Sequence, residues 1–166
     1  MPWSEEDAEE VQRQLRRQLD LSTRLTSFPE SVVGLDVSYE KATNRVCAAA
    51  VVIELESLAV TDVATVVGEV TFPYVPGLLA FREAQYPDLR RGAGSPLEEG
   101  GETLGRAIRT RDGVKPVFVS VGHRIGLDQA CDLTLSLCRR YRIPEATRQA
   151  DIVSRRGLRG SRRSGG

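Results

Sequence analysis

The stretch VVGLDVSYEKATNRVCAAAVVIEL (32–55) decides the fold class. Residues 32–39 alternate in the way of a strand, and residues 46–55 form an unbroken apolar run that is typical of a strand covered on both faces. The polar residues 42–44 between these two runs indicate a hairpin. With a third strand through 59–67, the sequence predicts a three-stranded meander for the first half of the chain.

Helical patterns stand before and after this meander. Residues 4–20 combine capping-box spacing with an apolar stripe, and a second helix is predicted from Leu127. Pro144 suits the first turn of a last helix that is expected to reach about Ser154. The sequence therefore predicts helices that pack on a sheet.

The second half contains further strands and one long loop. Residues 103–123 predict two strands joined around Asp112 and Gly113, a dipeptide that suits a tight hairpin. Residues 84–101 have no apolar period and are rich in glycine, so they are predicted to be a loop. Strands followed by helices predict an α/β fold, with a mixed sheet and flanking helices.

Length, composition and charge limit the class of protein. A chain of 166 residues with 40% apolar content fits one domain, placed at 1–154, and a basic tail at 155–166 is expected to be disordered. Residues 139–163 contain nine arginines against two acids, which suits contacts with phosphates. No apolar run is long enough for a membrane span, and three cysteines favour reduced thiols. A cytoplasmic protein without a membrane partner is expected, and a monomer is favoured.

Three titratable residues are candidates for a site. Asp36 lies on the strand face opposite its apolar neighbours, between two small residues, although an ordinary exposed acid fits the same pattern. Glu83 continues the buried stripe of a short predicted helix and needs either a metal shared with Asp36 or an arginine partner. His123 follows a strand, where a structural role is the alternative. Two converging carboxylates suit Mg²⁺, and hence phosphodiester chemistry.

Three blocks of the sequence resemble a known family. GLDVSY (34–39), PYVPGLLAFRE (73–83) and RTRDGVKPVFVSVGHRIGLDQA (109–130) together look like endonuclease V, a nuclease that incises DNA beside deoxyinosine. The resemblance implies a ribonuclease H-like fold, a requirement for Mg²⁺, and hydrolysis of the second phosphodiester bond on the 3′ side of the lesion. It also implies that Asp36 is a metal ligand, Glu83 a second acidic member of the site, and His123 a catalytic member at its edge.

The resemblance also assigns a substrate-binding segment. In the family, a loop of this type acts as a wedge at the lesion, and an aromatic ring can replace the stacking lost when a base turns out. The wedge and the pocket behind it would consist of Pro73, Tyr74, Val75, Pro76, Gly77 and Leu78.

The chain departs from the family pattern in its middle. After residue 89 the sequence passes to a segment that resembles a region well downstream, so the fold is predicted to be internally shortened, with the junction near 84–101. By resemblance, the absent block carries the second aspartate of the metal site. Two hypotheses follow: a magnesium-dependent endonuclease, or a weak or inactive nucleic-acid-binding remnant of that family.

Overall fold

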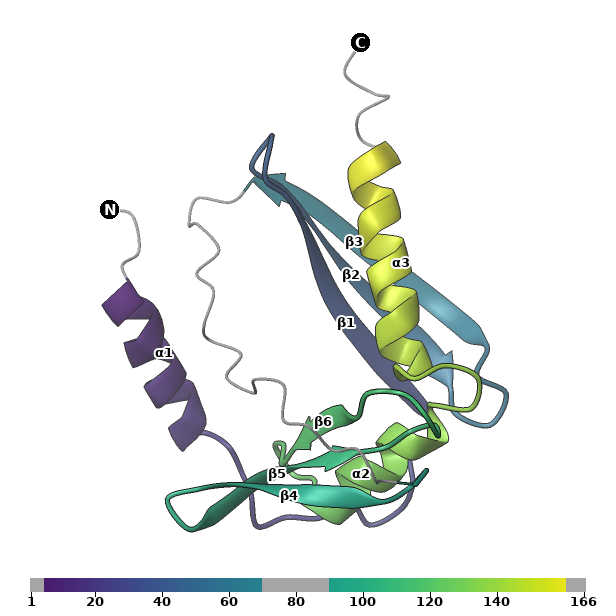
Figure 1. The fold of residues 1–166 in the computed structure, drawn as a ribbon. Helices are drawn as coiled ribbons and strands as arrows, with labels where there is room; N and C mark the ends of the chain where they lie inside the picture. The colour runs from purple at the N-terminus through teal and green to yellow at the C-terminus, as the bar shows by residue number, and fades with distance from the viewer. Residues whose placement is uncertain (1–4, 70–89, 161–166) are drawn as a thin grey trace. The chain divides into compact units, whose positions relative to one another are not determined.

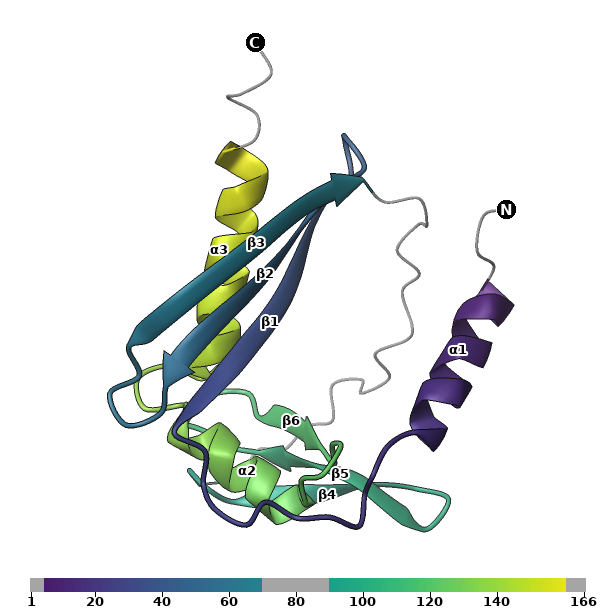
Figure 2. The ribbon, with the colours of Figure 1, turned by 180° about the vertical axis from the view of Figure 1, so that it is seen from behind.

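The computed structural model describes residues 5–69 and 90–160, which form helices and antiparallel sheets (Figures 1 and 2). Contacts divide the chain into two compact units: unit 1 comprises Met1–Phe28 and Phe72–Arg142, and unit 2 comprises Pro29–Thr71 and Ile143–Gly166. The predicted α/β class, with helices flanking sheets, is confirmed. In the part of the chain that is described, all strand pairs are antiparallel.

Unit 2 is a three-stranded meander covered by one helix. Its strands are β1 (Ser31–Glu40), β2 (Arg45–Glu54) and β3 (Val60–Glu69), in the spatial order β1-β2-β3, as the sequence predicted. Helix α3 (Glu145–Gly160) runs along one face of this sheet, as both views show (Figures 1 and 2). Unit 2 is therefore a two-layer arrangement of one helix on one sheet.

The core of unit 2 comes from one side of β2. The apolar run of β2 predicted a strand covered on both faces, but only every second side chain is fully buried, and the residues between them are half-buried. Side chains on one face of an antiparallel strand recur every two residues, so a single helix can cover one set only. The buried set is Cys47, Ala49, Val51 and Ile53.

Glycines allow α3 to lie close to the sheet. A Cβ atom added at Gly34 would overlap the backbone carbonyl of Ala146, and one added at Gly157 would overlap the sulfur of Cys47. The backbones of β1 and α3 therefore meet directly at Gly34, and at Gly157 the absence of a side chain on α3 leaves room for the sulfur of Cys47. This short separation brings small polar side chains of α3 within reach of β1.

The last helix is longer than the sequence predicted. It was expected to end near Ser154, before a disordered tail at 155–166, but it continues to Gly160. Arg155 forms an ion pair with Asp151 one turn earlier, and Leu158 is buried. Residues 155–160 are rich in arginine, so the sequence did not indicate this additional helical turn, one side of which is buried.

Over its described residues, unit 1 has three strands, as unit 2 does, and a different core. Its elements are α1 (Glu5–Arg17), β4 (Gly94–Glu99), β5 (Glu102–Ile108), β6 (Val117–Ser120) and α2 (Leu127–Ser136), with the strands in the order β4-β5-β6. Ile108, Val119 and Cys131 form its apolar cluster. The prediction of a loop throughout 84–101 was wrong for β4.

Two predictions on cell compartment concern the chain as a whole. Cys47, Cys131 and Cys138 are buried and free, which confirms the expected reduced thiols. Over the described residues, none of the helices has the length and apolar character needed to span a membrane.

A candidate metal site on strand β1 and helix α3

Asp36 lies on the face of β1 that α3 covers. It pairs in register with the buried Ala49 of β2, and its own side chain is partly exposed. Strand alternation puts Gly34 and Ser38 on the same face, so no bulky side chain of β1 stands beside the carboxylate. The space in front of Asp36 that the sequence predicted is bounded by α3.

A surface pocket of about 710 Å³ opens beside this carboxylate. Acidic side chains from both elements line it, together with basic side chains of α3 and apolar residues of both. The pocket is lined by Asp36, Val37, Ser38, Tyr39, Glu40, Asp151, Arg155, Leu158 and Arg159. The strand thus supplies acids and hydroxyl groups, and the helix supplies one acid and two guanidinium groups.

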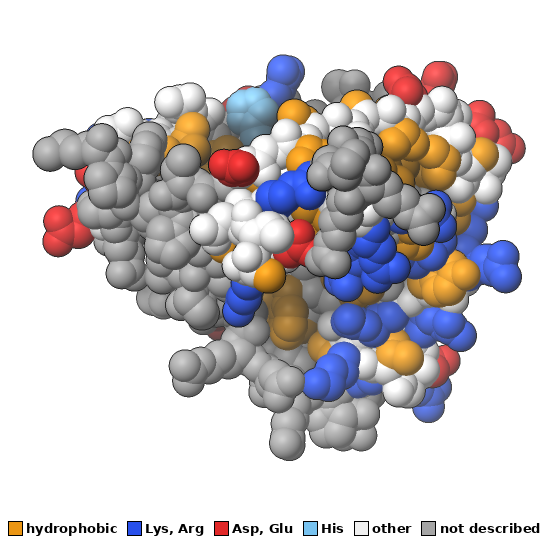
Figure 3. Space-filling view, turned by 90° about the horizontal axis from the view of Figure 1, so that it is seen from above, with side chains coloured by type: hydrophobic (Ala, Val, Ile, Leu, Met, Phe, Trp, Pro, Cys, Tyr) orange, Lys and Arg blue, Asp and Glu red, His pale blue; other side chains and the backbone are white. Residues whose placement is uncertain are grey.

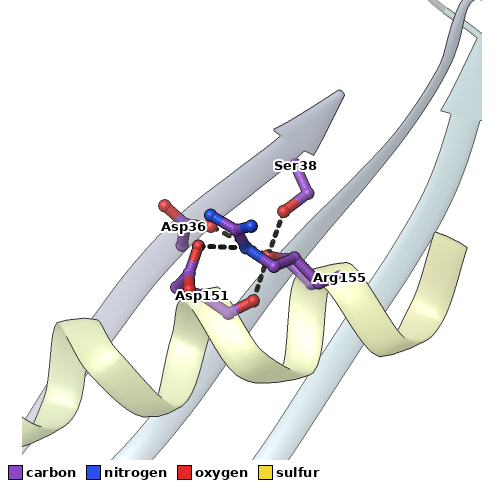
Figure 4. A network of polar contacts seen from close by, with 5 residues as sticks. Asp36, Ser38, Asp151 and Arg155 are labelled. Atoms are coloured by element: carbon purple, nitrogen blue, oxygen red, sulfur yellow. Dashed lines mark hydrogen bonds and ion pairs between the residues drawn. The ribbon is translucent and has the colours of Figure 1, made fainter. Parts of the chain in front are cut away.

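Asp151 supplies a second carboxylate from the opposite layer. The Nε atom of Arg155 donates to Asp151 Oδ1 at 2.7 Å, and the carboxylate of Asp36 lies beside this contact in the same pocket (Figure 4). The hydrogen bond and charge of Asp151 raise the pKa of Arg155, and the charge of Asp36 adds to the effect. Two negative groups therefore stabilise one positive charge at this position.

Two carboxylates held by a rigid strand and helix fit a hard divalent cation. Mg²⁺ takes oxygen ligands and is commonly bound through one or two carboxylates, with water and substrate phosphate completing its shell. Within the described ranges, no group of three His, Cys, Asp or Glu side chains is placed to hold a metal ion. Asp36 and Asp151 can therefore supply a two-carboxylate site, and remaining ligands would come from outside this pair.

Basic side chains gather near this pocket. Arg155 and Arg159 line it, and Figure 3, which looks down on the end at which α3 finishes, shows Lys and Arg side chains gathered on that face. A guanidinium group can bind two oxygens of one phosphate. The charge of the helix end therefore suits a polyanion beside the acidic pair.

His123 belongs to unit 1, where it contacts a loop. The backbone N–H of Asp20 donates to His123 Nδ1 at 3.0 Å, and the imidazole is exposed. The carboxylate of Asp20 accepts hydrogen bonds from the hydroxyl and the backbone N–H of Thr23 and from both groups of Ser22, which hold its pKa well below the usual range. Within unit 1, His123 helps to fix this turn, and its predicted catalytic role stays a prediction.

The other predicted site residues lie outside the described residues. They are Glu83, Pro73, Tyr74, Val75, Pro76, Gly77 and Leu78. Of the predicted site, the structure places Asp36 in a pocket with charged partners.

Comparison with known proteins identifies the family. A family model described as Endonuclease V matches residues 13–87 and 84–152. The endonuclease V of Streptomyces coelicolor is 40% identical over 217 aligned positions, which cover 95% of this chain and 92% of that protein. The chain belongs to the endonuclease V family. Membership of this family supports a nuclease, which is a class of hydrolase.

Solved structures of the family have the same fold. The crystal structure of endonuclease V from Streptomyces avermitilis is 38% identical, with a TM-score of 0.84, over 96% of this chain and 95% of that one. A Ciona intestinalis endonuclease V, crystallised with a 24mer DNA containing an inosine followed by a ribo-adenosine, has a TM-score of 0.76 over 93% and 97% of the two chains. At 20% identity the second likeness shows the fold alone. The predicted ribonuclease H-like fold is confirmed by kinship with these endonuclease V structures.

The comparison shows that this chain lacks residues that its relative has. An alignment of 217 positions exceeds the 166 residues of this chain by 51, so it contains at least that many positions at which this chain has no residue. The two matched segments meet at residues 84–87. The predicted position of the shortening, near 84–101, stays a prediction.

Sequence reasoning missed Asp151 as a site residue. It was counted only as one of two acids in an arginine-rich segment. Asp151, Ser154, Arg155 and Leu158 follow the spacing i, i+3, i+4, i+7, which puts them on one side of a helix. That period was a usable signal, but it crosses position 154, where the helix was expected to end.

Proposed function

We propose that this chain is a magnesium-dependent endonuclease that hydrolyses the second phosphodiester bond 3′ to deoxyinosine in DNA. The observation that carries the proposal is the placement of Asp36 and Asp151 around one pocket, with arginines at its rim. The missing block was expected to carry the second aspartate of the metal site. Asp151 supplies a second carboxylate from a part of the chain that is present.

The acidic and the basic residues of the pocket would have different roles. Mg²⁺, when bound, would polarise a phosphoryl oxygen and lower the pKa of a coordinated water. Asp36 and Asp151 would hold the cation from two fixed elements. Arg155 and Arg159 would bind non-bridging oxygens of the phosphate, where a guanidinium offers two parallel hydrogen bonds.

Specificity for deoxyinosine rests on kinship. The Ciona intestinalis relative was crystallised with inosine-containing DNA, and this chain retains the PYVPG sequence (73–77) that the family uses as a wedge. The wedge role of residues 73–78, the metal role of Glu83 and the cytoplasmic location stay predictions.

A nicking assay tests the proposed reaction. A labelled duplex oligonucleotide with one deoxyinosine, incubated with the purified chain and Mg²⁺, should be cut at the second phosphodiester bond 3′ to the lesion. Asp36→Asn and Asp151→Asn should each lower the single-turnover rate at least about 100-fold, the scale of losing one group that stabilises transition-state charge. The control Asp132→Asn, an exposed acid on α2 of unit 1, should cut at the parent rate. Parent-rate cutting by Asp36→Asn would refute the proposed site.

The missing central part favours a second candidate, a chain that binds inosine-containing nucleic acid without cutting it. In that case the parent would show no nicking with Mg²⁺ or Mn²⁺. Its affinity for the deoxyinosine duplex, measured by fluorescence anisotropy, would be the same in Asp36→Asn. Loss of both cutting and binding in the parent would refute both candidates.

A further inference from the structure

We infer that Ser154, with Ser38 behind it, is a positioning residue that fixes the orientation of the Asp36 carboxylate toward the pocket. The inference rests on the proposed function, because it gives Asp36 the role of a metal ligand. Its basis is a chain of hydroxyl contacts between β1 and α3 (Figure 4).

The donor order in this chain follows from chemistry. Ser154 Oγ lies 2.8 Å from Asp36 Oδ2 and 2.7 Å from Ser38 Oγ. An ionised carboxylate only accepts, so Ser154 must donate its single proton to Asp36 for that bond to form. The oxygen of Ser154 can then accept the proton of Ser38. Each hydroxyl polarises the next, which strengthens the bond that ends on the carboxylate.

A competing acceptor for the Ser154 proton lies within its own helix. Ser154 Oγ is 3.0 Å from the backbone carbonyl oxygen of Asp151, three residues earlier. The contact to Asp36 is shorter, and hydrogen bonds to an ionised acceptor are about twice as strong as neutral ones. The carboxylate is therefore the preferred acceptor.

Burial makes this arrangement costly unless it is fully bonded. The Ser154 residue has 0% relative exposure. A buried hydroxyl that lacks a partner destabilises a fold, and an alanine at this position would avoid that risk and favour the helix. The carbonyl of Asp151 could satisfy this hydroxyl within the helix, so the bond to Asp36 adds a contact that joins α3 to β1.

The bond from Ser154 makes the two carboxylate oxygens of Asp36 different from one another. Oδ2 is held by Ser154, whereas in the described parts of the chain nothing donates a hydrogen bond to Oδ1. With one oxygen held by a fixed helix, the carboxylate is restricted in rotation and Oδ1 is left to bind a cation. Gly34 makes this geometry accessible, because it lets α3 approach β1 closely.

Mn²⁺ binding to the full chain tests the inference. Free Mn²⁺ can be followed by its paramagnetic resonance signal, so a titration reports affinity without any nuclease activity. Ser154→Ala should weaken Mn²⁺ binding about 10-fold, the lower end of the effect of losing a group that orients a metal ligand. Ser136→Ala is the matched control, since Ser136 is also a helical serine, bonded to the carbonyl of Leu133 on α2. It should bind Mn²⁺ as the parent does.

A double-mutant cycle separates positioning from a general structural effect. In an Asp36→Asn background, adding Ser154→Ala should change Mn²⁺ affinity less than about 2-fold, because Ser154 acts through Asp36. A further 10-fold loss in that background would overturn the inference. Unchanged affinity of a folded Ser154→Ala chain would also overturn it.

Two further measurements keep the result decisive. If Ser154→Ala does not fold, Ser38→Ala takes its place and should weaken Mn²⁺ binding about 3-fold. Parent affinity in Ser38→Ala would overturn the inference.

If the parent itself binds no Mn²⁺, the proposed metal site fails, and the χ1 couplings of Asp36 measured by NMR decide the positioning role. One rotamer in the parent and averaging in Ser154→Ala would support it, whereas one rotamer in both would overturn it.

Discussion

Over the described residues, both units place a helix on a three-stranded antiparallel sheet, but they fill the buried part of that layer differently. In unit 1 the buried contact is apolar, with Cys131 of α2 against Ile108 and Val119, and an ion pair between Arg106 and Asp128 joins the two layers at the surface. In unit 2 the helix buries Ser154 against the acidic side of β1. A fold that needs stability alone favours the first solution, because buried polar groups must all find partners. The buried polar contact of unit 2 is therefore the feature on which the proposed role of Asp36 depends.

Two aspartates show the same difference on a smaller scale. Asp20 in unit 1 is held by Ser22 and Thr23, which follow it directly in the chain. Asp36 in unit 2 is held by Ser154, which is 118 positions away. A carboxylate fixed by its own turn stabilises a loop. One fixed by another element has an orientation that the whole unit determines.

The largest effect is expected from filling the space that lets α3 approach β1. Gly34→Ala places a Cβ where the carbonyl of Ala146 lies, so helix or strand must move. We expect a loss of at least about 3 kcal/mol in the free energy of unfolding, the upper range for overpacking. Urea denaturation followed by circular dichroism measures it.

A matched glycine in the same sheet is the control. A Cβ at Gly68 of β3 would meet only the Val46 side chain, 4.0 Å away, so Gly68→Ala should stay within about 0.5 kcal/mol of the parent. Equal stability of both variants would show that α3 does not lie as close to β1 as described.

A smaller effect, on metal affinity, is expected from removing the guanidinium group that already pairs with one of the two carboxylates. Arg155 pairs with Asp151, so a metal ion must compete with its guanidinium group. Exposed ion pairs are weak, so Arg155→Ala should tighten Mn²⁺ binding only about 2-fold to 3-fold at low ionic strength. Arg156→Ala, the exposed neighbour that does not line the pocket, should leave Mn²⁺ affinity unchanged. Weaker binding in Arg155→Ala would mean that this arginine supports the cation instead of competing with it.

Particular residues show how far sequence reasoning reached. The hairpin of β1 and β2 was predictable because alternation and an apolar run are local signals, and they also assigned Asp36 to its face. Strand β4 was not predictable, since Pro96 and the flanking glycines are typical of a loop; an edge strand tolerates them because one side needs no hydrogen bonds. Asp151 was missed because its partner Asp36 is far away in sequence. Only the close approach of α3 to β1 shows that they share a pocket.

The smallest effect is expected in the turn of unit 1. The hydrogen bonds from Thr23 and Ser22 lower the pKa of Asp20, so the carboxylate stabilises the turn at pH values above the unfolded value of about 3.9. This stabilisation is lost as the pH falls below that value toward the folded pKa. Thermal melts between pH 7 and pH 2.5 should show a smaller fall in Tm for Asp20→Asn than for the parent, whereas Asp132→Asn should follow the parent. Because the Asp20 amide also donates to His123 Nδ1, the NMR signals of this imidazole should shift in Asp20→Asn only if the turn opens. Identical acid profiles for all three chains would show that the turn does not depend on the charge of Asp20, and the contrast with Asp36 would then rest on unit 2 alone.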